Sequence, residues 1–184
     1  RRVPAGESPR DRSAAADLVG GCAGCCGGWM MPDFRIIPST EEHAIELADN
    51  MRQADVDEIK ASHGVDPLNG SVISFRSSEA CFTGMVDNRV ACLYGVIRRH
   101  IMSDRGMPWL LTTDLVERYA LPFLLGSRDV IVQMKNAFGY LENYADIRNV
   151  VALKWLRWLG FRMCHAEPWG VERRLFQRFY WEAA

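Results

Sequence analysis

The chain has 184 residues, of which 48% are hydrophobic and 24% are charged, a balance typical of one globular domain with its own core. Its formal net charge of -1 gives no electrostatic basis for general nucleic-acid binding. No uninterrupted apolar run in the sequence approaches the ~20 residues of a membrane-spanning helix, so we expect no insertion into a membrane.

The cysteines and histidines do not form a metal-binding motif. Cys22 and Cys25 make a single Cys-x-x-Cys pair, and the first histidine of the chain is His43. A zinc site needs about four ligands, usually supplied as two spaced pairs. The sequence therefore predicts no metal cofactor, and reduced thiols of the kind found in cytosolic proteins.

Residues 1–30 show neither helical nor strand periodicity and are rich in Gly, Ala, Arg and Pro, a composition typical of disorder. The chain starts with Arg1, whereas Met30-Met31-Pro32 looks like a natural start. We therefore expect residues 1–30 to be a disordered or non-native N-terminal extension. The folded domain is expected to span residues 31–184.

The first half of this domain shows one strand, two helices, a segment that fits a helix or a strand, and a hairpin. Apolar spacing places them at Phe34–Ile37, Glu41–Met51, Ala54–Lys60, Pro67–Ser77, and Ala80–Val86 with Val90–Ile97. Asp87-Asn88 lies between the last two runs, and this pair is typical of a tight hairpin turn.

The second half alternates strands and helices after a polar loop. The predicted segments are a loop at Ser103–Met107, strands at Trp109–Thr113 and Leu141–Ala145, a helix at Pro122–Phe138, a helix after Asn149, and strands at Phe161–Cys164 and Leu175–Trp181. A central hairpin followed by helical crossovers predicts a single α/β domain with a mixed, partly parallel sheet flanked by helices.

The segment NVVALKWLRWLGF, from Asn149 to Phe161, carries the clearest pattern. Asn149 can cap the helix start, and Gly160 lies where the helix would end. The helical spacing places Trp155 and Trp158 in the core. This Asn-x-x-Ala…Leu-Gly-Phe run resembles the last helix and the following strand of the GNAT (N-acetyltransferase) superfamily.

The GNAT resemblance covers nearly all of residues 34–181 and implies the acyl-CoA N-acyltransferase fold, with acetyl-CoA as the donor. In that family an Arg/Gln-x-x-Gly-x-Gly/Ala loop before the central helix binds the pyrophosphate of coenzyme A through backbone N–H groups. The pattern keeps Arg118, but Tyr119, Leu121 and Phe123 stand at the glycine places. These side chains are expected to crowd the phosphate path, and Pro122 removes one N–H donor.

Many GNAT enzymes also place a tyrosine in the helix after the asparagine, where it protonates the leaving thiolate. The matching residue here is Leu156, which has no proton to give. Both chemical signatures of the family are therefore altered, although the fold signature is kept.

The resemblance assigns candidate cofactor-binding residues to the end of one strand and the starts of two helices. They are Leu111, Thr112, Thr113, Arg118 and Asn149. The polar strand end could bind a pantetheine-like arm or polarise a substrate amine. Alternatively, a side chain there could simply cap the next helical turn.

Two acidic residues, Asp114 and Glu117, are the catalytic candidates. Asp114 is an alternative to Thr113 as the residue that caps the next turn. Glu117 could act as a general base, but it fits an ordinary helical salt bridge equally well.

Arg52, Asp55 and Glu58 follow one another at i, i+3 and i+6 on one helix face. This face could bind a partner or point toward a substrate. A solvated face with helical salt bridges is the commoner meaning of this spacing, and it is the interpretation we favour from the sequence.

Three stretches together resemble a narrower family, the GNAT-like internal virion proteins of short-tailed bacteriophages. They are Leu47–Ile59, Pro108–Asp114, and Asn143 with Asn149 and Leu159-Gly160-Phe161. This resemblance implies a phage-encoded protein without conventional acetyltransferase activity that acts in the virion core, in assembly or in genome ejection. It implies virion or assembly proteins as partners, and a location in the cytoplasm of the bacterial host or in the virion.

The alternative function is a divergent acetyl-CoA-dependent N-acetyltransferase that acts on an amine of a small molecule or protein. Arg118 and the polar strand end motivate this alternative. Amine attack on a thioester depends mainly on positioning and on an oxyanion site, so a missing acid lowers the rate without abolishing the reaction. A small adaptor that binds a host protein is a third hypothesis.

Overall fold

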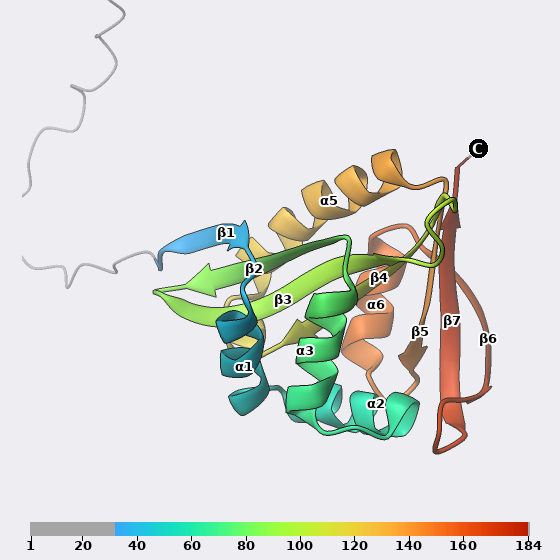
Figure 1. Ribbon diagram of the computed structural model, residues 1–184, viewed down its shortest axis with the longest axis horizontal. Helices are drawn as coiled ribbons and strands as arrows, with labels where there is room; N and C mark the ends of the chain where they lie inside the picture. Colours follow the sequence, from blue (N-terminus) through green and yellow to red (C-terminus); the bar gives the residue numbers. More distant parts are fainter. Residues whose placement is uncertain (1–31, 184) are drawn as a thin grey trace, which may run out of the picture. The chain divides into compact units, whose positions relative to one another are not determined.

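The computed structural model describes residues 32–183, so the predictions made for residues 1–30 lie outside the described part of the chain. These residues form a seven-stranded mixed sheet in the order β1-β2-β3-β4-β5-β7-β6 (Figure 1). The strands are β1 Phe34–Pro38, β2 Ala80–Val86, β3 Arg89–Arg98, β4 Arg105–Thr112, β5 Tyr140–Asp146, β6 Arg162–Trp169 and β7 Arg174–Glu182.

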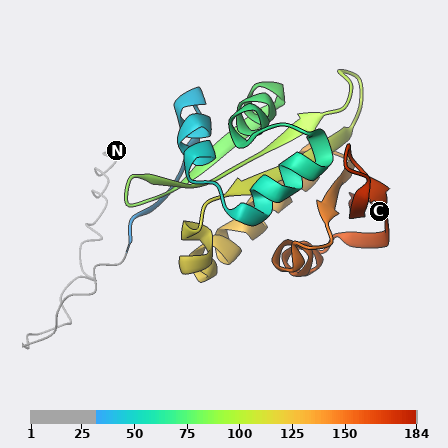
Figure 2. The same ribbon diagram turned by 90° about the horizontal axis from the view of Figure 1, so that it is seen from below.

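Helices cover both faces of this sheet (Figure 2). They are α1 Glu41–Asp49, α2 Gln53–His63, α3 Pro67–Ser77, α4 Leu115–Arg118, α5 Ala120–Ala137 and α6 Val150–Trp158. On one face, a buried cluster joins α1 to the sheet through residues such as Leu47 and Leu93. On the other face, Ile131 of α5 and Leu153 of α6 pack with Leu141.

This architecture confirms the predicted fold class, a single α/β domain with a mixed, partly parallel sheet flanked by helices. The predicted hairpin is also confirmed, because β2 and β3 pair antiparallel around Asp87 and Asn88. Both turn residues have positive φ, at 48° and 62°, as a type I′ turn requires.

The structure decides one segment that the sequence left open and corrects the bounds of one predicted loop. Pro67–Ser77 is a helix, since Pro67 occupies its first turn and the Asp66 side chain accepts a hydrogen bond from the Asn69 N–H. The loop predicted at Ser103–Met107 was wrong in its second half, because β4 already begins at Arg105. Gly106 pairs with β3 on one side and with β5 on the other. This pairing holds Gly106 in a strand, although glycine has a low strand propensity.

The side chains that α6 buries also differ from the prediction. Trp158 was expected in the core, but it is 43% exposed, and the Arg128 guanidinium lies 4.5 Å from its ring centroid. Trp155 is only partly buried. The residues that α6 and its end bury are leucines, including Leu153 and Leu156. Apolar residues occupy both faces of this helix, so spacing alone could not tell which face is buried.

Among residues 32–183, no helix has both the length and the apolar character needed to span a membrane.

Candidate functional site

The sheet opens between its two central parallel strands. β4 and β5 pair only at their first residues, Arg105 with Tyr140 and Gly106 with Leu141. Beyond that point β5 continues to pair with β7, and β4 continues to pair with β3. A pocket of about 760 Å³ is lined by residues 108–112 of β4 and residues 143–145 of β5, a size within the range of small-molecule sites.

At every second residue of β4, the backbone N–H and C=O groups point into this opening. The Thr112 N–H donates to Asp55 on α2 at 2.9 Å, and the Pro108 carbonyl accepts from the Asn143 side chain of β5 at 3.0 Å. Both groups therefore point away from β3. Because peptide direction alternates along a strand, the Leu110 N–H and C=O also point toward β5. The pocket thus contains a strand edge that a ligand can pair with.

A buried carboxylate holds α2 against the end of β4. Asp55 is 5% exposed, and its Oδ2 accepts hydrogen bonds from the Thr112 N–H at 2.9 Å and from the Thr112 hydroxyl at 2.6 Å. The Arg52 N–H donates to the Thr112 carbonyl at 2.9 Å. These contacts occupy the polar groups of Thr112 and fix the start of α2 at the mouth of the pocket.

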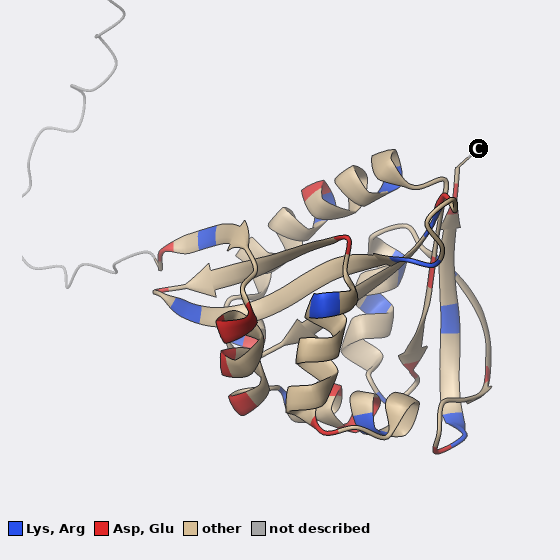
Figure 3. Ribbon diagram, in the orientation of Figure 1, with Lys and Arg blue, Asp and Glu red and all other residues tan. Residues whose placement is uncertain are grey.

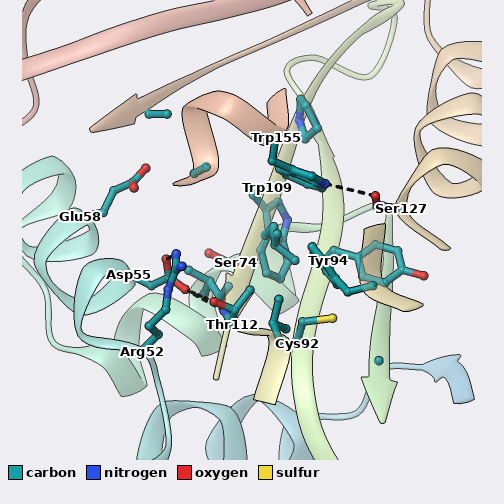
Figure 4. Close-up of a pocket in the computed structure, with 18 of the residues that line it drawn as sticks. Arg52, Asp55, Glu58, Ser74, Cys92, Tyr94, Trp109, Thr112, Ser127 and Trp155 are labelled. Carbon is teal, nitrogen blue, oxygen red and sulfur yellow. Dashed lines mark hydrogen bonds and ion pairs between the residues drawn. The ribbon is translucent and has the colours of Figure 1, made fainter. Parts of the chain in front are cut away.

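The Arg52 guanidinium, which lies beside Asp55 in Figure 4, also contacts α4 and the residue that precedes α6. It contacts Asp55 at 2.8 Å and Glu117 of α4 at 3.2 Å, and it donates to the Asn149 side chain at 3.4 Å. Its Nε is buried with no hydrogen-bond partner among residues 32–183. Arg52 is therefore held mainly by acidic partners, and it balances part of their charge.

Glu58 is the residue of this cluster whose pKa lies far from its ordinary value. It lies one turn after Asp55 on α2 and lines the pocket, and the Asn149 side-chain N–H donates to its carboxylate at 3.2 Å. Burial raises the pKa of Glu58 to about 7, against the lowering effect of the Asn149 hydrogen bond and with a further increase from the Asp55 charge. A carboxyl with such a pKa can exchange a proton near neutral pH.

The sequence had favoured a solvated face for Arg52, Asp55 and Glu58. That interpretation was wrong for Asp55, which is buried, and all three residues line the pocket. The alternative, a face that points toward a ligand site, fits their position. Glu58 was not among the catalytic candidates, because no sequence signal distinguishes a helix face of this spacing that lines a pocket from one that faces solvent.

Of the predicted cofactor-binding residues, Thr112 and Asn149 meet in the cluster around Asp55. Leu111 lines the pocket as well, but it also packs against the core beneath α1 and α3. Thr113 points elsewhere, since its hydroxyl donates to the Ala91 carbonyl at 3.1 Å. The same hydroxyl accepts from the Leu115 N–H at 3.4 Å, which is the capping role weighed as the alternative.

The two catalytic candidates, Asp114 and Glu117, lie at the surface. Asp114 is exposed, and its side chain makes no cap hydrogen bond to α4. Glu117 has a 59% exposed side chain and pairs with Arg52, which is the salt-bridge alternative. Arg118 is exposed, and its guanidinium lies 5.6 Å from the centroid of the Tyr119 ring.

The segment compared with the phosphate-binding loop is helical. The N–H groups of Arg118, Tyr119 and Phe123 donate to backbone carbonyls one turn earlier, so they are not free to bind a pyrophosphate. Leu156 is 6% exposed and packs in the core, where it can supply no acid. These residues therefore do not form a phosphate cradle.

Comparisons with solved structures identify the fold. The chain is similar to an acetyltransferase of the GNAT family from Streptococcus pneumoniae, with 11% identity over 83% of this chain and 100% of that chain and a TM-score of 0.59. It is similar to an N-acetyltransferase from Staphylococcus aureus, with 11% identity over 82% and 98% and a TM-score of 0.60. The RimL ribosomal L7/L12 α-N-protein acetyltransferase in complex with coenzyme A aligns with 6% identity over 82% and 94% and a TM-score of 0.60.

The protein therefore has the fold of the GNAT N-acetyltransferases. No model of a known protein family matches the chain, and no curated protein matches it either. The narrower resemblance to phage virion proteins is not tested by these neighbours and stays a prediction. Within residues 32–183, no group of three or more His, Cys, Asp or Glu side chains could hold a metal ion.

We predict that Asp55→Ala lowers the free energy of unfolding by about 3 kcal/mol or more, because it leaves the buried Thr112 groups and Arg52 without their main partner. Chemical denaturation measures this loss. Asp57→Ala, at an exposed position of the same helix, is the matched control and should change stability by less than about 0.5 kcal/mol. Equal losses in the two variants would contradict the bridging role of Asp55.

We predict that Glu58→Gln stabilises the fold in a pH-dependent way. The folded pKa of about 7 lies above the ordinary glutamate value of 4.5, so the fold favours the protonated form. The cost of ionising Glu58 grows as pH rises from 4.5 to 7 and then stays constant. Denaturation at pH 4 and pH 8 should show little difference at the lower pH and a gain of about 1–3 kcal/mol at the higher pH. A gain independent of pH would refute the raised pKa.

Proposed function

We propose that the protein transfers an acyl group from a coenzyme A thioester to a primary amine. The observation that carries this proposal is the position of Glu58, a carboxyl with a pKa raised to about 7 in the pocket that opens between β4 and β5. The GNAT fold of the chain supports the proposal, because the similar structures include N-acetyltransferases. This was the alternative function in the sequence analysis.

The charges near α2 suit a cationic acceptor. α1 carries Glu41, Glu42, Glu46 and Asp49 with no Lys or Arg (Figure 3). Asp55 and Glu58 then follow on α2, and Arg52 pairs with Asp55 at 2.8 Å. A surplus of negative charge concentrates ammonium groups near the pocket.

In the proposed reaction, Glu58 accepts one proton from the substrate ammonium, which leaves a neutral and nucleophilic amine. The amine nitrogen forms a bond to the thioester carbonyl carbon, and the Leu110 N–H stabilises the negative charge that develops on the carbonyl oxygen. The C–S bond then breaks. The second proton of the attacking nitrogen passes to the departing sulfur, so no acid is needed at Leu156.

We predict that Glu58→Gln lowers kcat/KM about 10²- to 10⁴-fold, because an amide cannot accept the ammonium proton. The wild-type rate should rise with pH through about 7, as Glu58 becomes ionised. The assay follows loss of acetyl-CoA by mass spectrometry with a panel of primary amines and the full chain. Asp57→Asn, next to Glu58 but exposed, is the control. A variant that keeps the wild-type rate and pH profile would exclude Glu58 as the base.

We also predict that the full chain binds acetyl-CoA, measured by calorimetry with free coenzyme A as the reference ligand. Micromolar binding would mean that the pocket holds the donor without a glycine-rich phosphate loop. No binding of any acyl-CoA at millimolar ligand to a folded protein would contradict an acyltransferase function. It would favour the phage-derived scaffold hypothesis, in which the fold serves virion or assembly partners.

A further inference from the structure

The helix α5 covers its face of the sheet only in part. Of its 18 residues, only Ser127 and Ile131 are buried, although a helix of this length usually buries a continuous stripe. Ile131 and Met134 pack against the core near β5 and α6. One side of α5 lines the pocket along most of its length, through Phe123, Gly126, Ser127, Val130, Ile131 and Met134. The space between this side of α5 and the sheet is therefore a chamber of the pocket.

Uncharged side chains line this chamber from both sides. They are Gly84, Cys92, Tyr94 and Leu110 from the sheet, with Phe123 and Gly126 from α5. Burial raises the pKa of the Cys92 thiol to about 12, so this thiol stays neutral. The Ser127 hydroxyl is already used, since it donates to the Leu124 carbonyl at 2.8 Å and accepts from the Trp155 indole N–H at 3.1 Å (Figure 4).

The glycine in α5 shows where the chamber is empty. A Cβ atom built on Gly126 would have no atom within 4 Å apart from those of its own chain neighbours and helix backbone. By contrast, a Cβ on Gly84, across the chamber on β2, would meet the Cys92 sulfur at 2.7 Å. Open space inside a domain is unusual, because protein interiors are close-packed with few voids larger than a water molecule. The free volume at Gly126 thus indicates room for a ligand.

The chamber is continuous with the opening between β4 and β5. The same pocket includes Leu110 and Leu111 of β4, Asn143 of β5 and Trp155 of α6. Trp155 and Phe123 lie side by side with ring centroids 5.6 Å apart and form an aromatic wall along this path. A thioester carbonyl at the Leu110 N–H would therefore have an apolar space available for the rest of its acyl group.

We propose that this chamber holds the acyl chain of the donor, and that the preferred donor is a medium-chain fatty acyl thioester of coenzyme A. This inference rests on the proposed acyltransferase function and specifies its substrate class. An alkyl chain fits because it loses no hydrogen bonds on entering an apolar space. A polar group would leave water for a lining whose named hydroxyl groups are those of Tyr94 and Ser127, and the Ser127 hydroxyl is already bonded.

The test is calorimetric binding of coenzyme A, acetyl-CoA and octanoyl-CoA to the full chain. Each buried methylene contributes about a fourfold gain in affinity, so octanoyl-CoA should bind about a hundredfold or more tighter than acetyl-CoA. Octanoyl-CoA binding no tighter than acetyl-CoA would overturn the chain-binding chamber and leave the acyltransferase function standing. Absence of binding by every thioester would overturn both.

Gly126→Leu tests the location, because the new side chain would fill the chamber at its open point. We expect this variant to lose most of the octanoyl-to-acetyl affinity ratio. Asn136→Leu places the same side chain at an exposed position of the same helix and should keep the wild-type ratio. A folded Gly126→Leu protein with an unchanged ratio would overturn the proposal. If that variant does not fold, the wild-type series and Gly126→Val decide the question in the same way.

Discussion

The site depends on the two hydrogen bonds between Asp55 and Thr112. A carboxylate that is 5% exposed accepts two hydrogen bonds from the last residue of β4, and the Arg52 N–H binds the carbonyl of the same residue. Asp55 and Arg52 thus take the hydrogen-bonding places at the Thr112 backbone that β5 would otherwise fill. The two parallel strands can therefore separate after two paired residues without leaving the polar backbone of Thr112 buried and unpaired.

The same contact organises the chemistry around the opening. By fixing the start of α2, it sets Glu58 over the pocket one turn later, where Asn149 orients the carboxylate. Asn149 also caps α6. The same asparagine therefore connects the start of α6 to Glu58, the proposed base. On the far side of β4, the partly buried helix α5 leaves an apolar chamber. Proton transfer and acyl-chain binding would thus occupy opposite ends of one cavity.

Local signals predicted much of the fold. Asp87-Asn88 predicted the hairpin, and Asn149 with Gly160 predicted the bounds of α6, because turns and caps depend on a few adjacent residues. The site could not be predicted in this way. Asp55 is buried by a residue 57 positions later in the chain, and its helical spacing looks the same on a solvated surface. The chamber depends on how far α5 lies from the sheet, which no sequence pattern records.

The proposed function requires an acyl thioester to pair with β4 in the opening. Amide hydrogen exchange of the full chain, resolved by residue with NMR, with and without acetyl-CoA, tests this pairing. We expect the Leu110 N–H to exchange more slowly with acetyl-CoA bound, whereas amides on the outer face of α5 keep their rates. Unchanged exchange at Leu110, with protection appearing on another surface, would contradict it and would place ligand binding outside this pocket.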